Sequence, residues 1–162
     1  MNRKLEENAT AVGAIQVVAD IVPGINRQII ARIRGHEVIM DVRKERGGDD
    51  TAPAPPEYLA ISLGGCMINL IRLMAVEKNA ALTNLRVTID GLIDPSLAMG
   101  LTSDNRAGFI QMNAKITMDI DLSSEAQDCF IDEFNRRCPL CDTIGNGTIL
   151  QSRFLFQPVN GD

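Results

Sequence analysis

Two cysteines lie far apart in this chain, each in a distinctive sequence frame. Cys66 is the third residue of a Gly-Gly-Cys-Met segment, and Cys138 opens a Cys-Pro-Leu-Cys segment that ends at Cys141. Two framed thiols are typical of redox chemistry on sulfur, in which one thiolate reacts and another closes a disulfide. The residue types therefore favour a thiol enzyme or a redox sensor, and each cysteine must be weighed against a purely structural role.

Cys66 lies in a long apolar segment, where a free cysteine is commonly a small hydrophobic residue of the core. The two glycines before it, Gly64 and Gly65, cost about 1 kcal/mol each in a helix interior. Something should offset that cost, such as a backbone or a ligand that approaches closely beside the thiol, or a helix–helix contact. The glycines thus favour a functional position for Cys66.

Cys138 precedes Pro139, and proline is well tolerated in the first turn of a helix. This places Cys138 at or just before a helix N-cap, where amide groups and the helix dipole favour the thiolate. The alternatives are an exposed cysteine in a turn and half of a zinc site. Zinc usually needs four ligands, and besides Cys138 the chain offers only Cys141, Cys66 and its single histidine, His36.

Cys138 and Cys141 also have the C-x-x-C spacing of disulfide oxidoreductases. That motif normally opens a helix directly after a strand in a β-α-β unit. Here it follows a predicted helix, so we do not expect a thioredoxin-like protein. The fourth cysteine, Cys129, lies in that preceding helix beside Phe130, and we expect it in the core.

A peroxide-reactive thiolate also needs a nearby cation, which stabilises the thiolate and polarises the O–O bond. Several arginines upstream of Cys66 are candidates, and most of them are expected to be ordinary solvated charges. Arg27, in the loop-like segment 23–27, is the one least explained by strand alternation. The candidates are Arg27, Arg32, Arg34, Arg43 and Arg46.

The elements before Cys66 are predicted from alternation and from turn residues. Three strands are expected over residues 14–22, 28–35 and 36–43. In the last of them apolar residues alternate with the polar Glu37 and Asp41. Glycines, aspartates and prolines predict a loop over 46–56. The helix predicted over 57–79 is apolar around nearly its whole circumference, so it is expected to be buried or shared with a partner subunit.

After the long helix, alternation predicts two further strands and then a helical region. The strict period of two over residues 110–122 indicates a strand with one face on a core. Ser123 or Ser124 is expected to cap a helix that ends at Arg137. The remaining predicted elements are a strand over 85–89, a short helix after Pro139 and a last strand over 148–156. This order predicts an α+β fold with an antiparallel sheet.

The bulk composition narrows the class of protein. The chain has 162 residues with 45% hydrophobic content, which predicts one domain over residues 1–162. A net charge of −5 argues against nucleic acid or an anionic membrane as partner. No segment is expected to span a bilayer, and the N-terminus lacks the apolar core of a signal peptide. We therefore expect a cytoplasmic protein whose thiols are kept reduced.

The chain resembles the family of osmotically inducible protein C and organic hydroperoxide resistance proteins, in a less characterised branch. The resemblance extends over residues 14–157 and rests on the order and spacing of four segments. It implies an α+β fold that is stable as an intertwined homodimer, with the buried helices at its centre and two thiol sites at the subunit interface. The four segments are 47–49, 53–59, 63–66 and Cys138 with Pro139.

The resemblance also implies an activity. The cysteine at the position of Cys66 attacks a peroxide and becomes a sulfenic acid, and the one at Cys138 resolves it as a disulfide. A dithiol, such as a lipoylated protein, then reduces that disulfide. An upstream arginine, matched here to Arg27, and a glutamate near the helix start, matched to Glu57, orient the thiolate. No cofactor or metal is implied.

One departure from the family pattern concerns Glu57. In the organic-hydroperoxide branch the glutamate stands one residue earlier, at the position of Pro56. Glu57 is nine residues before Cys66, or about 180° around an ideal helix, which favours a role in capping the helix start. Two alternatives to a peroxidase therefore stay open. One is a thiol enzyme or redox sensor that uses Cys138 and Cys141, and the other is a non-catalytic dimer that binds a small molecule.

Overall fold

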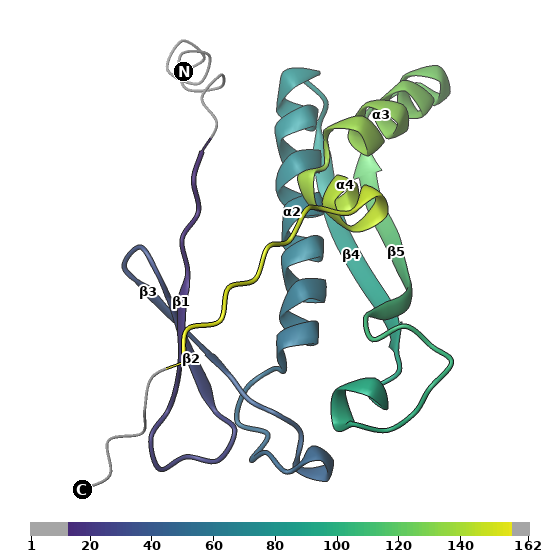
Figure 1. The fold of residues 1–162 in the computed structure, drawn as a ribbon. Coiled ribbons are helices and arrows are strands. Elements are labelled where there is room, and N and C mark those ends of the chain that lie inside the picture. The colour runs from purple at the N-terminus through teal and green to yellow at the C-terminus, as the bar shows by residue number, and fades with distance from the viewer. Residues whose placement is uncertain (1–12, 157–162) are drawn as a thin grey trace, which may run out of the picture. The chain divides into compact units, whose positions relative to one another are not determined.

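The structure is a computed structural model that describes residues 13–156 (Figure 1). The chain divides into two compact units, with the boundary between Tyr58 and Leu59 in the first turn of the long helix α2. The prediction of one domain over residues 1–162 stays a prediction. The α+β class, with antiparallel sheets and a long central helix, is confirmed.

The N-terminal unit contains a three-stranded antiparallel sheet. Its strands are β1 (Val18–Ile21), β2 (Ile29–Ile33) and β3 (His36–Met40), in the spatial order β1-β2-β3. All three predicted strands are present, in shorter form. Ala31 of β2 pairs with Ala19 on one side and with Val38 on the other, and its side chain is buried. Arg34 takes a positive φ of 55° in the turn between β2 and β3.

The C-terminal unit combines most of α2 with a long two-stranded ribbon and two helices. Helix α2 covers Pro55–Glu77, and the antiparallel strands are β4 (Leu82–Ile93) and β5 (Phe109–Ile120). Helices α3 (Ser124–Arg137) and α4 (Pro139–Asn146) follow and lie beside the second half of α2 (Figure 1). Ser123 caps α3 as predicted, because its hydroxyl accepts the Ala126 N–H at 3.3 Å.

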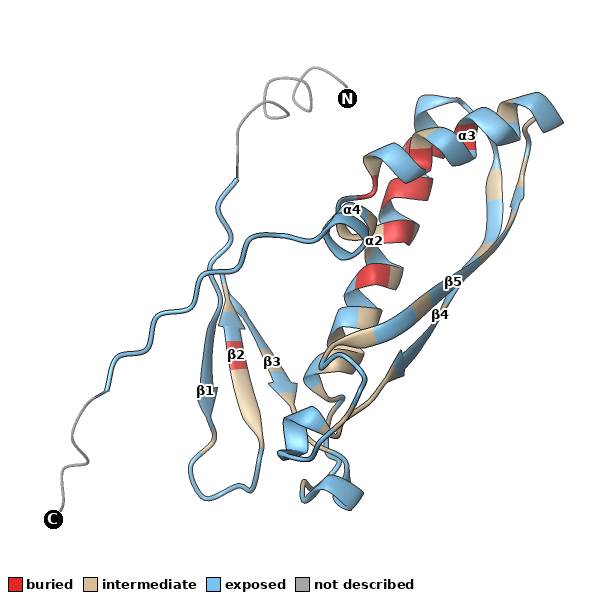
Figure 2. Cartoon of the chain, turned by 45° about the vertical axis from the view of Figure 1, so that its right-hand side comes forward, coloured by how far each residue is buried: buried red, intermediate tan, exposed pale blue. Residues whose placement is uncertain are grey.

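The core of this unit forms between one face of α2 and α3. Its buried α2 side chains recur at the helical spacing of three or four residues, so they lie on one stripe. In this unit, Figure 2 shows the buried residues on α2 and α3, where the two helices lie close together. Apolar side chains of β4 and β5 pack partly buried against this cluster. The buried members are Leu63, Met67, Leu70, Ile71, Met74, Phe130, Phe134 and Cys138.

The opposite face of α2 is exposed, so the predicted burial holds for one face only. Ile61, Leu73 and Val76 are 55%, 45% and 74% exposed. The helix is long and apolar enough to cross a membrane, which corrects our expectation that no segment qualifies. Length and composition alone are weak evidence for a span, since the core helix of a soluble protein passes the same test. The stripe of buried side chains fits the core helix of a soluble fold.

The strand predicted over residues 148–156 is wrong. These residues have no regular secondary structure, and Ile149 and Phe156 are 89% and 93% exposed. A strand needs a neighbour to accept and donate its backbone hydrogen bonds. No strand in the described part of the chain pairs with this segment. The apolar residues of this segment therefore did not suffice to make a strand.

Candidate thiol site

The two framed cysteines meet in the C-terminal unit. The Sγ atoms of Cys66 and Cys138 lie 4.0 Å apart although 72 residues separate them in the sequence. All four cysteines of the chain are free thiols. A disulfide has an S–S length of about 2.05 Å, so the pair is unbonded but within reach of a small side-chain movement.

Cys138 is the single residue that links α3 to α4. Its N–H donates to the Phe134 carbonyl at 3.0 Å, which ends α3, and its carbonyl accepts the Asp142 N–H at 3.0 Å, which opens α4. Pro139 fills the first position of α4, where no N–H is needed. The predicted place of Cys138 at a helix start is thereby confirmed.

The burial of the cysteines differs from expectation at two places. Cys138 is only 1% exposed and packs in the core cluster with Phe130 and Phe134, so the alternative of an exposed turn cysteine is wrong. Cys129 is exposed rather than buried, because Phe130 fills the inward face of α3 beside it. Cys66 is half-buried, so a small molecule can approach its sulfur more easily than that of Cys138.

The pKa of the Cys66 thiol is raised above its ordinary value. Burial is the main cause, and the neighbouring Cys138 adds to it through its charge and hydrogen bond. The backbone of Leu140, in the first turn of α4, acts in the opposite direction by hydrogen bonding. No arginine of the described chain is among the groups that shift this pKa. At neutral pH the thiolate of Cys66 is therefore scarcer than that of a solvated cysteine.

Cys141 makes the pair a cluster of three thiols. It is half-buried in the first turn of α4, three residues after Cys138. Its pKa is raised to about 12, first by burial and then by the hydrogen bond and charge of Cys138, with a smaller effect of Cys66. His36, the other residue considered for zinc, lies on β3 in the N-terminal unit. Within residues 13–156, no group of three or more His, Cys, Asp or Glu side chains is placed to hold a metal ion.

Glu57 holds an arginine and also caps the start of α2. Its Oε1 accepts from Arg43 Nε at 3.1 Å and from Arg43 Nη2, while its Oε2 accepts the Ala54 N–H at 2.8 Å. The Ala54 hydrogen bond, followed by the one from Arg43, lowers the pKa of the Glu57 carboxyl. The expected capping role is therefore present together with an ion pair.

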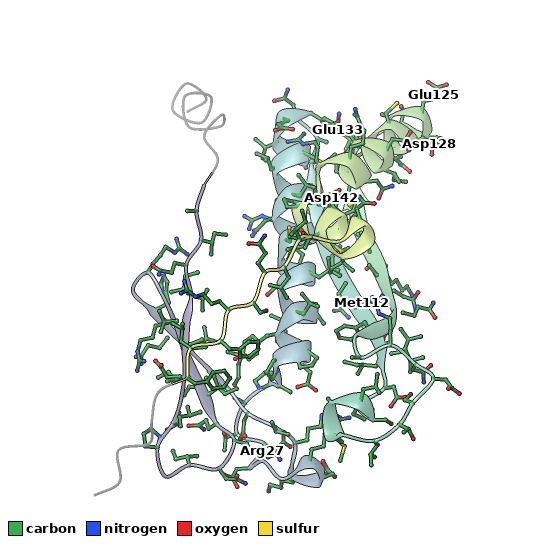
Figure 3. All side chains as sticks on the ribbon, viewed as in Figure 1. Arg27, Met112, Glu125, Asp128, Glu133 and Asp142 are labelled. Atoms are coloured by element: carbon green, nitrogen blue, oxygen red, sulfur yellow. The ribbon has the colours of Figure 1, made fainter. Side chains whose placement is uncertain are left out.

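The arginine beside Glu57 is thus Arg43, one of the five candidates, and not Arg27. Arg27, labelled in Figure 3, takes a positive φ of 55°. Its Nε would lie 3.7 Å from a Cβ at Gly47. Arg27, Arg43 and Glu57 belong to the N-terminal unit, and Cys66 and Cys138 to the C-terminal one. A role for Arg27 at the thiolate stays a prediction.

A buried carboxylate shapes the loop that carries Arg43. Asp41 has no exposed surface, and its carboxylate accepts the Val42 N–H at 2.7 Å, the Thr51 N–H at 2.9 Å and the Thr51 hydroxyl at 2.7 Å. The Thr51 hydrogen bonds are the main reason why the pKa of Asp41 falls to about 2. The alternating pattern had shown Asp41 only as a polar strand residue. The local sequence did not indicate that Asp41 is buried and hydrogen-bonded to Thr51.

The glycines of this loop have a steric explanation. A Cβ at Gly48 would lie 1.8 Å from the Val42 carbonyl oxygen, so only glycine fits there. Gly47 takes a φ of 82° at the end of a short 3-10 helix, η1 (Lys44–Arg46). The glycines before Cys66 differ, because a Cβ at Gly64 would make only an ordinary contact with Ile89, and one at Gly65 would meet nothing within 4 Å. The close approach expected at Gly64 and Gly65 is therefore absent from the described chain.

A charged network joins the ends of α2 and α3 next to the thiols. Arg137, directly before Cys138, donates to both carboxylate oxygens of Glu77, at 2.6 and 3.0 Å, and to Glu133 at 2.6 Å. Lys78 pairs with the other oxygen of Glu133 at 2.8 Å, and Figure 3 shows Glu133 on α3. The predicted long helix gave no sign that Glu77 and Lys78, at its end, form ion pairs. Their partners lie too far along the chain for a local pattern to reveal.

Comparison with known proteins gives a family match and a set of similar folds. The model of the OsmC-like protein family matches residues 47–153. An OsmC-like protein from Mycoplasma pneumoniae is similar with a TM-score of 0.68 at 19% identity, covering 82% of this chain and 88% of that one. No curated protein matches this chain.

Two further solved structures carry names that refer to hydroperoxides. An organic hydroperoxide resistance protein from Legionella pneumophila has a TM-score of 0.58 at 18% identity, covering 83% of this chain and 91% of that one. An organic hydroperoxide resistance protein from Elizabethkingia anophelis has a TM-score of 0.51 at 18% identity, covering 85% and 92%. At such identities the likeness shows a shared fold.

Proposed function

Since this chain belongs to the OsmC-like protein family, we propose that it is a thiol-dependent peroxidase for organic hydroperoxides or hydrogen peroxide. The observation that carries the proposal is the 4.0 Å separation of the Cys66 and Cys138 sulfur atoms. Cys66 is the more accessible of the two, which suits the thiol that meets the substrate. The names of two similar structures refer to resistance against organic hydroperoxides and support the same substrate class.

The reaction begins with attack of the Cys66 thiolate on one peroxide oxygen. The O–O bond breaks, an alcohol or water leaves after taking up a proton, and Cys66 becomes a sulfenic acid. The Cys138 thiolate then attacks the Cys66 sulfur, hydroxide leaves as water, and the disulfide forms. An external dithiol, such as a lipoylated protein, returns both thiols by disulfide exchange. No cofactor or metal takes part.

Activation of Cys66 requires a cation, because burial raises the pKa of its thiol. Arg27, or Arg43 held by Glu57, is the arginine that we propose for this role. We further propose a homodimer in which a second copy covers the exposed apolar face of α2. The 74% exposure of Val76 on that face supports such a partner, since contiguous exposed apolar surface commonly marks an interface. The cytoplasm is the compartment that keeps these thiols reduced.

The test is disulfide mapping after exposure to peroxide. Reduced protein is treated with one equivalent of cumene hydroperoxide or hydrogen peroxide and digested without reductant for mass spectrometry. We expect a Cys66–Cys138 crosslink at early times, with stoichiometric loss of peroxide. Cys129→Ser is the matched control, because this exposed thiol has no part in the reaction. Absence of any reaction of Cys66 at millimolar peroxide would overturn the proposal.

Two observations favour a second candidate function, a non-catalytic dimer that binds a small molecule. The raised pKa of Cys66 disfavours a reactive thiolate within a single chain. A hollow of about 560 Å³ lies between β5 and α3, and mostly apolar side chains such as Met118, Phe130 and Ile131 line it. If this function is right, peroxide is not consumed, and alkylation of Cys66 proceeds no faster than that of Cys129.

A further inference from the structure

The sulfur of Cys138 is within reach of two different partners. On one side lies Cys66, with 4.0 Å between the Sγ atoms. On the other side lies Cys141, because Cys138 is the N-cap of α4 and Cys141 is the third residue of that helix. Side chains at these two positions approach each other at helix starts, as in the capping box, and residues three apart on a helix have Cβ atoms about 5–6 Å apart. A disulfide needs Cβ atoms about 3.5–4.5 Å apart, so the Cys138–Cys141 bond requires the first turn of α4 to tighten, and the two pairings compete for one sulfur.

Building on the peroxidase function proposed above, we propose that Cys141 takes the disulfide over from Cys66. In this relay the Cys66–Cys138 disulfide forms first. The Cys138–Cys141 disulfide replaces it and is the one that the external dithiol reduces. The C-x-x-C segment then works as a storage disulfide rather than as the site of peroxide attack. Its consequence is that Cys66 becomes a free thiol again before any reductant arrives.

The transfer is a thiol–disulfide exchange without net oxidation. The Cys141 thiol gives up its proton, and its sulfur attacks Sγ of Cys138 in the Cys66–Cys138 disulfide. The Cys138–Cys141 bond forms as the Cys66–Cys138 bond breaks, and the Cys66 thiolate leaves with the bonding electron pair. Cys66 then takes up the proton that Cys141 released. The two electrons removed by the peroxide remain missing from the protein throughout.

The surroundings of the three thiols support this order. Burial is the main cause of the raised pKa of both Cys141 and Cys66, and Cys138 adds to it in each case because it neighbours both thiols. Once Cys138 is part of a disulfide it no longer ionises, so that contribution to the raised pKa of Cys141 is relieved. Cys138 is 1% exposed, whereas Cys141 is half-buried. Cys66 is half-buried as well, so an incoming dithiol can reach one sulfur of either disulfide, and the transfer changes which thiol, Cys66 or Cys141, is left free.

Equilibrium in glutathione tests the relay without any peroxide. The Cys129→Ser protein is incubated in buffers of reduced and oxidised glutathione, quenched with acid and mapped by mass spectrometry. We expect Cys138–Cys141 to be the dominant disulfide. The double variant, which carries Cys66→Ser as well as Cys129→Ser, should form the same bond. If Cys66–Cys138 dominates, or if the Cys66→Ser protein fails to form the Cys138–Cys141 bond, the relay is wrong. This arm is independent of the peroxidase proposal, which fails separately if peroxide is not consumed.

Peroxide stoichiometry then tests the direction of transfer. Without reductant, the Cys129→Ser protein should consume about two equivalents of peroxide per chain, because Cys66 is liberated once and oxidised again. The Cys141→Ser variant in the same background should consume about one and retain the Cys66–Cys138 bond. A time course should show Cys66–Cys138 first and Cys138–Cys141 later. Equal stoichiometry in the two proteins would overturn the relay.

Discussion

Replacing Arg137 by methionine removes the cation that joins the ends of α2 and α3. The guanidinium binds both carboxylate oxygens of Glu77, and the two side chains are 32% and 43% exposed. Solvent screens a pair of this exposure, so we assign it no more than about 1 kcal/mol of the free energy of unfolding. A domain of this size loses about 2–4 °C in Tm per kcal/mol, which sets the expected decrease. Urea unfolding and thermal melts of the reduced protein measure both quantities.

The pH dependence shows whether charge is the cause of this decrease. The Arg137 hydrogen bond is the main reason why the pKa of Glu77 lies below its ordinary value of 4.5. A lowered carboxyl pKa contributes stability that is present above the ordinary value and is lost as the pH falls through the folded value. The difference between native protein and Arg137→Met should therefore shrink below pH 4.5 and also in 1 M salt.

The neighbouring Arg136 provides the matched control. Its side chain is exposed and makes no ion pair with another residue of the described chain. Arg136→Met should leave the Tm within about 1 °C of the native value, because exposed substitutions commonly have little effect. Equal loss of stability in the two variants, or a loss for Arg137→Met that persists at low pH and high salt, would refute the reasoning.

Three further perturbations test other parts of the fold. Met74→Ala should cost about 2–5 kcal/mol in urea unfolding because Met74 is fully buried. Val76→Ala, on the exposed face of α2, should change the stability of the isolated chain by about 0.5 kcal/mol or less. Equal effects at a protein concentration where the chain is monomeric would contradict the assigned core. Gly65→Ala should stabilise the isolated chain by about 0.5–1 kcal/mol, because alanine is favoured over glycine in a helix and the added Cβ meets nothing within 4 Å. A loss of stability would show that another part of the protein packs on Gly65. Asp41→Asn should destabilise the fold at pH 7, because it weakens the hydrogen bonds to Thr51. The difference in free energy of unfolding from the native protein should diminish as the pH falls from 3.8 toward about 2. A difference that is constant with pH would exclude the lowered pKa of Asp41.

The thiol site shows how far local sequence information reaches. Pro139 and the residue pattern around it sufficed to place Cys138 at the start of a helix, because helix starts are governed by residues within one turn. The same reasoning failed for Cys129, which shares its helix with two core phenylalanines and yet faces solvent. Which face of a helix is buried depends on what packs against it.

The arginine beside Glu57 illustrates the same limit. Five upstream arginines had comparable claims from sequence, and the preference for Arg27 rested on what strand alternation left unexplained. The loop anchored by Asp41 instead brings Arg43 to the glutamate. The burial of Asp41 depends on a hydrogen bond to Thr51, ten residues away. The residue pattern of a single strand therefore cannot predict that burial.

By itself, the sequence determined the α+β class, the strands with strict alternation, the long apolar helix and the two framed cysteines. These features depend on periodicity and on residues that are near neighbours in the chain. Only the tertiary structure decided that Cys66 and Cys138, 72 residues apart, place their sulfur atoms 4.0 Å from each other. It also left residues 148–156 without a partner strand among residues 13–156. Both outcomes depend on packing between distant segments, for which local propensity has no information.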